Sequence, residues 1–212
     1  MSKNMKTNEA DTGMHILGIT GGIGSGKSEV LHLLSDTPDS CIVEADRLAH
    51  QLMMPGRAAY HRIVECFGKE ILAQDGTIDR SILGRIVMQS PENLEQLNRI
   101  VHPAVKKSIR GRIKRAEARG VRLFVIEAAL LIQDGYRSIC DELWYIFVER
   151  EIRIRRLLET RGGTRGKWEA FLANQPEERF FRENTDVTIE NNGTKEELCL
   201  KINNELQRLF LK

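Results

Sequence analysis

The fold is decided near the amino end, by the sequence HILGITGGIGSGKS at residues 15–28. Its first six residues are mostly apolar and are followed by two glycines, which predicts a buried strand that ends in a tight turn. A helix is expected from Lys27 or Ser28 onward, because apolar residues recur after it at helical spacing. The segment therefore predicts a strand, a glycine-rich turn and a helix in direct succession.

The turn and the start of that helix, residues 21–28, fit the pattern G-x-x-x-x-G-K-[ST]. Glycines let the backbone wrap closely round an anion, so that successive N–H groups and the positive helix N-terminus face its oxygens. We expect Lys27 to act at the β- and γ-phosphates of a nucleoside triphosphate and the Ser28 hydroxyl to bind Mg²⁺. A glycine-rich turn that binds nothing is the alternative, and the flanking strand and helix weigh against it. The predicted ATP-binding residues are Gly22, Ile23, Gly24, Ser25, Gly26, Lys27 and Ser28.

Further apolar runs predict the rest of a sheet. Three of them are clear and the fourth is weaker, and amphipathic helical patterns lie between them. Strands that alternate with helices indicate an α/β fold, here a P-loop NTPase-like, largely parallel sheet with flanking helices. The runs are at residues 41–43, 123–126, 143–148 and 187–189.

Roughly 70 residues of mostly helical pattern separate the second strand from the third, too many for a simple crossover. A helical insertion that helps to bind the acceptor substrate is one interpretation, and a purely structural elaboration is the other. Residues 1–13 are expected to be a flexible N-terminal extension. The remainder is expected to be one kinase domain, with a core sheet in 14–54 and 120–212, a helical lobe at about 55–119 and a lid at about 153–175.

Composition excludes several classes of protein. There are 32 Lys and Arg against 30 Asp and Glu, so the net charge of +2 gives no reason to expect a nucleic acid partner. No apolar run approaches the length of about 20 residues that a membrane helix requires, and we expect a cytoplasmic protein. The four cysteines are far apart and indicate neither disulfides nor zinc. Nothing in the sequence indicates an obligate protein partner.

Two acidic residues follow predicted strands, where open α/β folds bind ligands. Asp46 can accept a proton from a substrate hydroxyl, or it can cap the helix that follows it. Both roles do not easily coexist. Glu127 can bind Mg²⁺ through water or simply lie solvated at a strand end, and the residues leave these alternatives open.

Six arginines crowd residues 150–165, and a solvated charged face is the usual explanation for such a run. The segment Arg161-Gly162-Gly163-Thr164-Arg165 nevertheless combines cations with glycine hinges, which is typical of a lid that closes over phosphates. Arg161 is the best single candidate in it. His102 precedes Pro103 and, by itself, indicates a helix boundary or a core histidine more than a ligand.

With these motifs in this order, from about Leu17 to Gly193, the chain resembles the dephospho-coenzyme A kinase family. The alanine–aspartate pair after the second strand and the LNRIVHP segment are far more particular to that family than the glycine-rich loop. The matching segments are ITGGIGSGKS at 19–28, ADRLA at 45–49, FG at 67–68, DG at 75–76, DR at 79–80, LNRIVHP at 97–103, LL at 130–131, NQ at 174–175, Asp186 and NNG at 191–193.

The resemblance implies ATP-dependent phosphorylation of the ribose 3′-hydroxyl of dephospho-coenzyme A, the last step of coenzyme A synthesis, with Mg²⁺. It implies that Asp46, Lys27 and Arg161 are catalytic, with Arg161 in the lid. It assigns Asp46, His102, Leu130 and Leu131 to the acceptor side. ATP and dephospho-coenzyme A are the expected small-molecule partners.

The chain departs from the family's usual pattern in two places that bear on the site. The usual Asp-Ala-Asp is Glu44-Ala45-Asp46, and the usual Pro-Leu-Leu-x-Glu is ALLIQ at residues 129–133. Since Asp46 is retained, the expected activity stands, and the acceptor contacts at 129–133 are the less secure part. Another P-loop kinase, of the shikimate or uridine kinase type, is the nearest rival. A regulatory GTPase would need N-K-x-D and D-x-x-G motifs that the chain lacks, and a non-enzymatic nucleotide sensor would not need a carboxylate and an arginine-rich lid.

Overall fold

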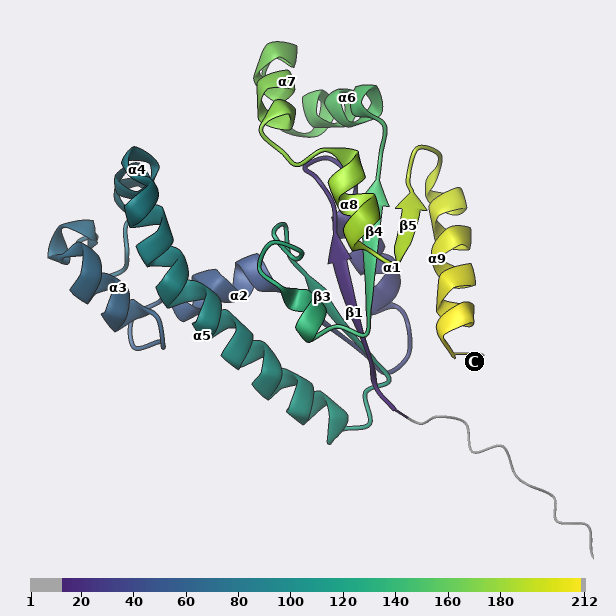
Figure 1. The fold of residues 1–212 in the computed structure, drawn as a ribbon, viewed down its shortest axis with the longest axis horizontal. Coiled ribbons are helices and arrows are strands. Elements are labelled where there is room, and N and C mark those ends of the chain that lie inside the picture. Colours follow the sequence, from purple (N-terminus) through teal and green to yellow (C-terminus); the bar gives the residue numbers. More distant parts are fainter. Residues whose placement is uncertain (1–12, 211–212) are drawn as a thin grey trace, which may run out of the picture. The chain divides into compact units, whose positions relative to one another are not determined.

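A computed structural model describes residues 13–210 of the chain, so the predicted flexible extension lies almost entirely outside the described residues. Within this part a five-stranded sheet has the order β2-β3-β1-β4-β5 (Figure 1). The pairs β1/β3, β1/β4 and β4/β5 are parallel. The prediction of an α/β fold with a parallel sheet and flanking helices is confirmed. The strands are β1 His15–Thr20, β2 Ser40–Glu44, β3 Leu123–Glu127, β4 Glu142–Phe147 and β5 Val187–Glu190.

The chain divides into two compact units, one formed by the residues up to 42 and from 117 onward, and one formed by residues 43–116. The helices are α1 Lys27–Ser35, α2 Ala45–Leu52, α3 Tyr60–Phe67, α4 Arg80–Gln89, α5 Pro91–Glu117, α6 Arg150–Arg161, α7 Arg165–Ala173, α8 Glu178–Asn184 and α9 Lys195–Phe210, with short 3₁₀ turns η1 Lys69–Ile71 and η2 Tyr136–Ser138. In the described part of the chain no helix is both long and apolar enough to cross a membrane.

Strand β1 is the central strand of the sheet and lies between β3 and β4. The loop that follows β1 therefore begins at the carboxyl end of the sheet, between these two neighbouring strands. The register pairs Ile19 with Glu127 of β3 and Thr20 with Tyr145 of β4. In a parallel sheet all carboxyl ends meet at one edge, and the crevice beside such a strand is where α/β proteins bind ligands.

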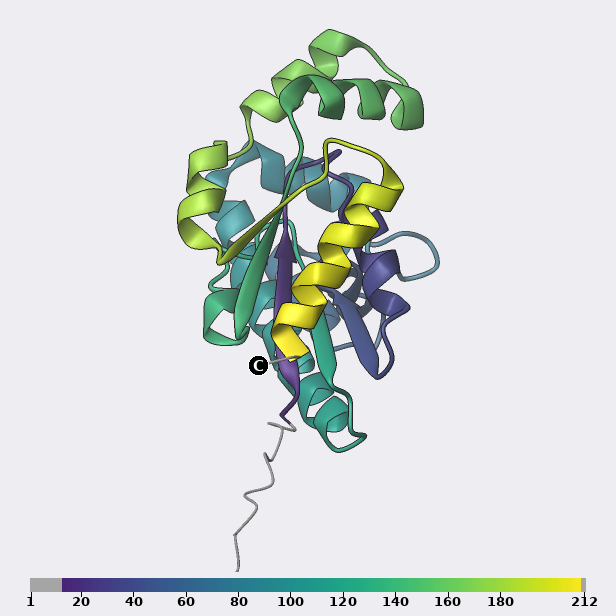
Figure 2. The same ribbon diagram turned by 90° about the vertical axis from the view of Figure 1, so that its right-hand side faces the viewer.

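One face of the sheet is covered by α1 and α9, which lie side by side (Figure 2). Every second residue of each strand points to this face, and these residues pack against the apolar side of each helix, where residues recur every three to four positions. Burying such aliphatic side chains stabilises the fold by about 1.5–3 kcal/mol each. Helix α9 is amphipathic, and Leu198, Ile202 and Leu206 are buried along one side of it. The cluster includes Leu17, Ile19, Val30, Leu34, Val125, Trp144, Ile146, Ile189, Leu198 and Ile202.

The unit of residues 43–116 is mainly helical, and two of its helix starts follow local chemistry. Asp79 caps α4, because its Oδ1 accepts from the backbone N–H groups of Ser81 and Ile82 at 2.8 and 3.1 Å. Helix α5 begins at Pro91, where a proline loses no intrahelical hydrogen bond.

The expectation of a helix boundary at His102-Pro103 is wrong, since α5 runs unbroken through Pro103 to Glu117. A proline inside a helix costs roughly 3 kcal/mol. Ile100, Val101, Val105 and Ile109 are buried along this helix, and their burial offsets that cost.

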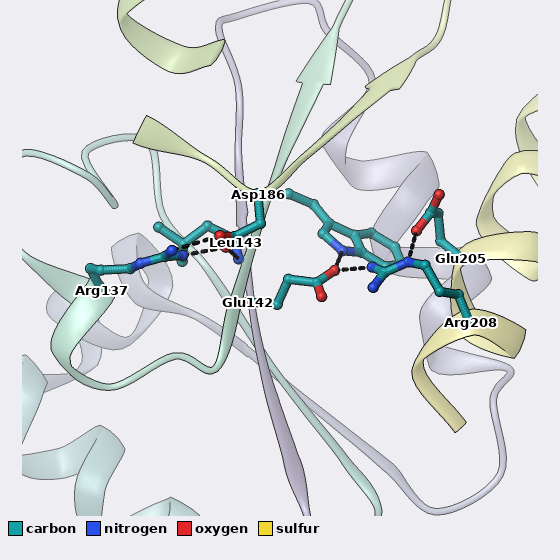
Figure 3. Close-up of polar contacts among 7 residues, drawn as sticks. Arg137, Glu142, Leu143, Asp186, Glu205 and Arg208 are labelled. Atoms are coloured by element: carbon teal, nitrogen blue, oxygen red, sulfur yellow. Dashed lines mark hydrogen bonds and ion pairs between the residues drawn. The ribbon is translucent and has the colours of Figure 1, made fainter. Parts of the chain in front are cut away.

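At the amino end of β4, Asp186 ties three segments together (Figure 3). Its carboxylate accepts from both terminal nitrogens of Arg137, one of them at 2.6 Å, and from the backbone N–H of Leu143 at 2.7 Å. The hydrogen bonds from Arg137 hold the pKa of Asp186 below its usual value, whereas partial burial opposes the shift.

A second polar group at the same end joins β4 to α9 (Figure 3). Glu142 accepts from the Trp144 indole N–H at 2.5 Å and from Arg208, whose Nε donates to Glu205 at 2.6 Å. Glu142 is the first residue of β4 and pairs with Leu17, whereas the last residue of β1, Thr20, pairs with Tyr145. These contacts therefore lie at the amino end of the strands, away from the loop that follows β1. Their role is therefore structural.

Candidate active site

The glycine-rich loop joins β1 to α1 with a backbone that only glycines adopt without strain. Gly24 and Gly26 have φ values of +75° and +85°. Gly26 is also the N-cap of α1 in the left-handed conformation, where a Cβ would overlap the amide nitrogen of Asn191. The loop therefore requires glycine here both for its torsion angles and for the close approach of a buried side chain.

Two carbonyl groups of the loop are held from outside by side chains from distant elements. The Asn191 Nδ2 donates to the Ser25 carbonyl at 2.9 Å, and Asn191 itself is only 6% exposed. The Arg153 Nε donates to the Ile23 carbonyl, also at 2.9 Å. Because the C=O and N–H of a trans peptide point in opposite directions, fixing these carbonyls turns the next N–H groups the other way. This is the arrangement that an anion-binding loop needs.

Lys27 lies against the same loop. Its Nζ donates to the carbonyl of Gly21 at 2.7 Å and lies 3.7 Å from Oε1 of Glu127. Glu127 is the last residue of β3 and is 9% exposed, so the alternative of a solvated strand end is wrong. The structure thus gathers Lys27, Glu127 and the loop at the carboxyl edge of β1 and β3.

Three hydroxyl groups border the loop. Among the described residues, Thr20 Oγ1 and Ser25 Oγ are buried atoms without a hydrogen-bond partner. Ser28 is exposed on the first turn of α1. No group of three or more His, Cys, Asp or Glu side chains within residues 13–210 is placed to hold a metal.

The donor set fits Mg²⁺ of the kind that is bound together with a nucleotide. This ion keeps several waters and takes one or two protein oxygens plus phosphate oxygens, so it needs no cage of carboxylates. The exposed Ser28 hydroxyl and the Glu127 carboxylate carry oxygen atoms of that chemical type.

Asp46 lies in the unit of residues 43–116, in the first turn of α2. The alternative that it caps this helix is wrong, because α2 begins one residue earlier and its N-cap is Glu44. The Asp46 side chain is exposed. Burial and the charge of Arg80 lower the pKa of His50 in the same helix, while the Asp46 carboxylate acts on it in the opposite direction.

The predicted acceptor residues differ in exposure. His102 is half-buried in α5, within the same unit as Asp46. Leu130 is 48% exposed, whereas Leu131 is fully buried and lies against Gly18 of β1. Leu131 is therefore a core residue in this structure, and of the two leucines only Leu130 has an exposed side chain.

The arginine-rich segment forms a pair of helices beyond the carboxyl end of β4 (Figure 1). Arg161 is exposed at the end of α6, and Gly162 and Gly163, with φ values of +63° and +85°, turn the chain into α7. Trp168 donates from its indole N–H to the Gly162 carbonyl at 2.9 Å. The predicted role of Arg161 over phosphates stays a prediction.

Sequence patterns missed two residues that shape the loop. Asn191 was part of a family motif without a role, and Arg153 was one of six arginines in a run. Nothing in the spacing separates Arg153 from the other five, because its partner, the Ile23 carbonyl, lies 130 residues away in the chain.

A parallel sheet with a glycine-rich, lysine-containing loop between its central strand and a helix defines a P-loop nucleotide-binding protein, and solved structures share the fold. A dephospho-CoA kinase from Campylobacter jejuni aligns with a TM-score of 0.69 at 21% identity, over 92% of this chain and 97% of that one. A shikimate kinase from Acinetobacter baumannii shares the fold at 16% identity, with a TM-score of 0.54 over 94% and 96% of the two chains.

The chain belongs to the dephospho-CoA kinase family. A sequence model of the family described as Dephospho-CoA kinase matches residues 15–197. A dephospho-CoA kinase from Carboxydothermus hydrogenoformans is 39% identical over 91% of this chain and 93% of its own length. One from Geobacter sulfurreducens is 40% identical over 89% and 95%. The resemblance inferred from the motifs is thus confirmed.

Proposed function

We propose that this protein transfers the γ-phosphoryl group of ATP to the ribose 3′-hydroxyl of dephospho-coenzyme A and so forms coenzyme A. The observation that carries the nucleotide half of the proposal is the loop itself, whose carbonyls at Ile23 and Ser25 are held outward by Arg153 and Asn191. Membership of the dephospho-CoA kinase family supports the acceptor half.

In this proposal Lys27 neutralises charge on the β- and γ-phosphates. An ammonium group has three donors, so Lys27 can keep its bond to the Gly21 carbonyl and still donate to phosphate oxygens. Mg²⁺, when bound, would be held by Ser28 and Glu127 and would neutralise charge on the β- and γ-phosphates.

Two further residues complete the proposed chemistry. Asp46 accepts the proton of the acceptor hydroxyl, for which an exposed carboxylate that does not cap its helix is suited. Arg161, at the glycine hinge between α6 and α7, steadies the charge that develops during transfer as the lid closes. His102 and Leu130 contribute to the acceptor site. A cytoplasmic location stays a prediction from the sequence.

The test is an assay of ADP release with and without dephospho-coenzyme A, with NMR of the product to locate the new phosphate. We expect ADP release to depend on dephospho-coenzyme A and the phosphate to be on the 3′-oxygen. Shikimate and uridine in the same assay test the rival P-loop kinases. Release that depends on one of those alcohols instead would overturn the acceptor assignment.

A further inference from the structure

Within the arginine run, Arg153 is the residue whose side chain donates a hydrogen bond to the glycine-rich loop. It lies on α6, is half-buried, and its Nε donates to the Ile23 carbonyl at 2.9 Å. The peptide that this carbonyl shares with Gly24 is planar and trans, so the Gly24 N–H points away from Arg153. A guanidinium on one side of this peptide therefore fixes which way an anion-binding N–H on the other side points.

The other end of the guanidinium is bound as well. Its Nη2 donates to Oε1 of Gln175, which follows α7. The backbone N–H of Gln175 in turn donates to the Leu172 carbonyl of that helix at 3.1 Å. A guanidinium has five donors in a rigid plane, so Arg153 can hold both partners at once, whereas a lysine could not do so with the same geometry.

The loop is built to let this side chain approach. A Cβ at Gly22 would overlap both the Arg153 Nη2 and the Gln175 Oε1. Gly22 is needed for this close approach and not for a positive φ, because any side chain there would separate the guanidinium from the loop.

We propose that Arg153 is a positioning residue that sets the Gly24 N–H for nucleotide phosphate and couples the loop to the end of α7 through Gln175. The inference rests on the proposed nucleotide site. Arg153 itself does not contact the substrate, and Gln175 affects nucleotide binding only through Arg153.

The test is calorimetric titration of the full chain with ATP and, separately, with ADP, for the wild type and the variants R153A, Q175A and the double variant. R155A is the matched control, since Arg155 is an exposed arginine on the same helix. Losing a hydrogen bond from a charged donor predicts an affinity about 10-fold lower or more for R153A. We expect a smaller loss for Q175A, no further loss when Q175A is added to R153A, and wild-type affinity for R155A.

Thermal unfolding of each variant separates a loss of folded protein from a loss of affinity. If R153A does not fold, R153K replaces it in the test. Lysine keeps the positive charge but not the planar set of guanidinium donors, so Q175A should lower ATP affinity much less in the R153K background than in the wild type. Affinity within about twofold of the wild type for folded R153A, or an equal effect of Q175A with and without Arg153, would overturn the inference. Failure of the wild-type protein itself to bind ATP would instead refute the proposed function.

Discussion

Replacing Gly26 with alanine tests whether the conformation of the glycine-rich loop depends on the left-handed torsion and on the close packing of Asn191. Gly26 has φ +85° and ψ +24°, and an added Cβ would displace the Asn191 amide. A residue with a Cβ in the left-handed conformation costs about 1–2 kcal/mol. Losing the hydrogen bond from Asn191 to the Ser25 carbonyl adds about 0.5–1.5 kcal/mol.

The expected loss in the free energy of unfolding is therefore about 1.5–3.5 kcal/mol, which for a protein of this size lowers Tm by about 3–14 °C. Urea and thermal unfolding followed by circular dichroism measure it. ATP affinity should fall as well, because the Ser25 carbonyl is no longer held and the next N–H loses its orientation.

The matched control is Gly84→Ala, since Gly84 lies inside α4 with open space at its Cβ position. Alanine there should stabilise the protein by about 0.5–1 kcal/mol. If Gly26→Ala were as stable as the wild type and bound ATP equally well, the strain and the Asn191 contact would have been misjudged.

Four other changes have expected outcomes. Asp46→Asn should leave ATP affinity unchanged and slow turnover by about 10²- to 10⁴-fold, as steady-state kinetics and calorimetry can measure. Lys27→Ala should weaken both ATP binding and turnover, each by about 10-fold or more. Because Arg137 lowers the pKa of Asp186 on folding, the stabilisation is present above the unfolded value of about 3.9 and is lost as pH falls through the folded value. The Tm difference between wild type and Asp186→Asn should accordingly shrink as pH is lowered from about 7 to about 3. Asp79→Ala should lower the free energy of unfolding by about 1 kcal/mol, measured in urea, because α4 loses its cap.

Each of these can fail in a recognisable way. Near-normal turnover of the Asp46 variant would remove that carboxylate from the mechanism, and unchanged ATP affinity of the Lys27 variant would remove the lysine from the phosphate site. A Tm difference independent of pH would mean that Asp186 acts by packing and not by charge. Wild-type stability of the Asp79 variant would show that α4 forms without its cap.

The sequence by itself determined the order of elements, because each depends on neighbours in the chain. Runs of apolar residues specify a strand whatever its position in the sheet. The glycines of residues 21–26 specify a turn, because they lack a Cβ atom. The lysine and the hydroxyl that follow are placed by the helix that starts there. The strands, the loop and α1 could all be predicted from such local patterns.

Tertiary packing decided which side chains contact one another, and these contacts cannot be predicted from local sequence patterns. Leu130 and Leu131 are adjacent and chemically alike, yet one is exposed and the other lies in the core. Pro103 predicts the end of a helix, but the apolar burial along α5 offsets the cost of the proline, and the helix continues through it. Arg153 differs from the other arginines near it because its guanidinium donates to a carbonyl 130 residues earlier and to Gln175. Such contacts join distant parts of the chain, so only the folded structure determines them.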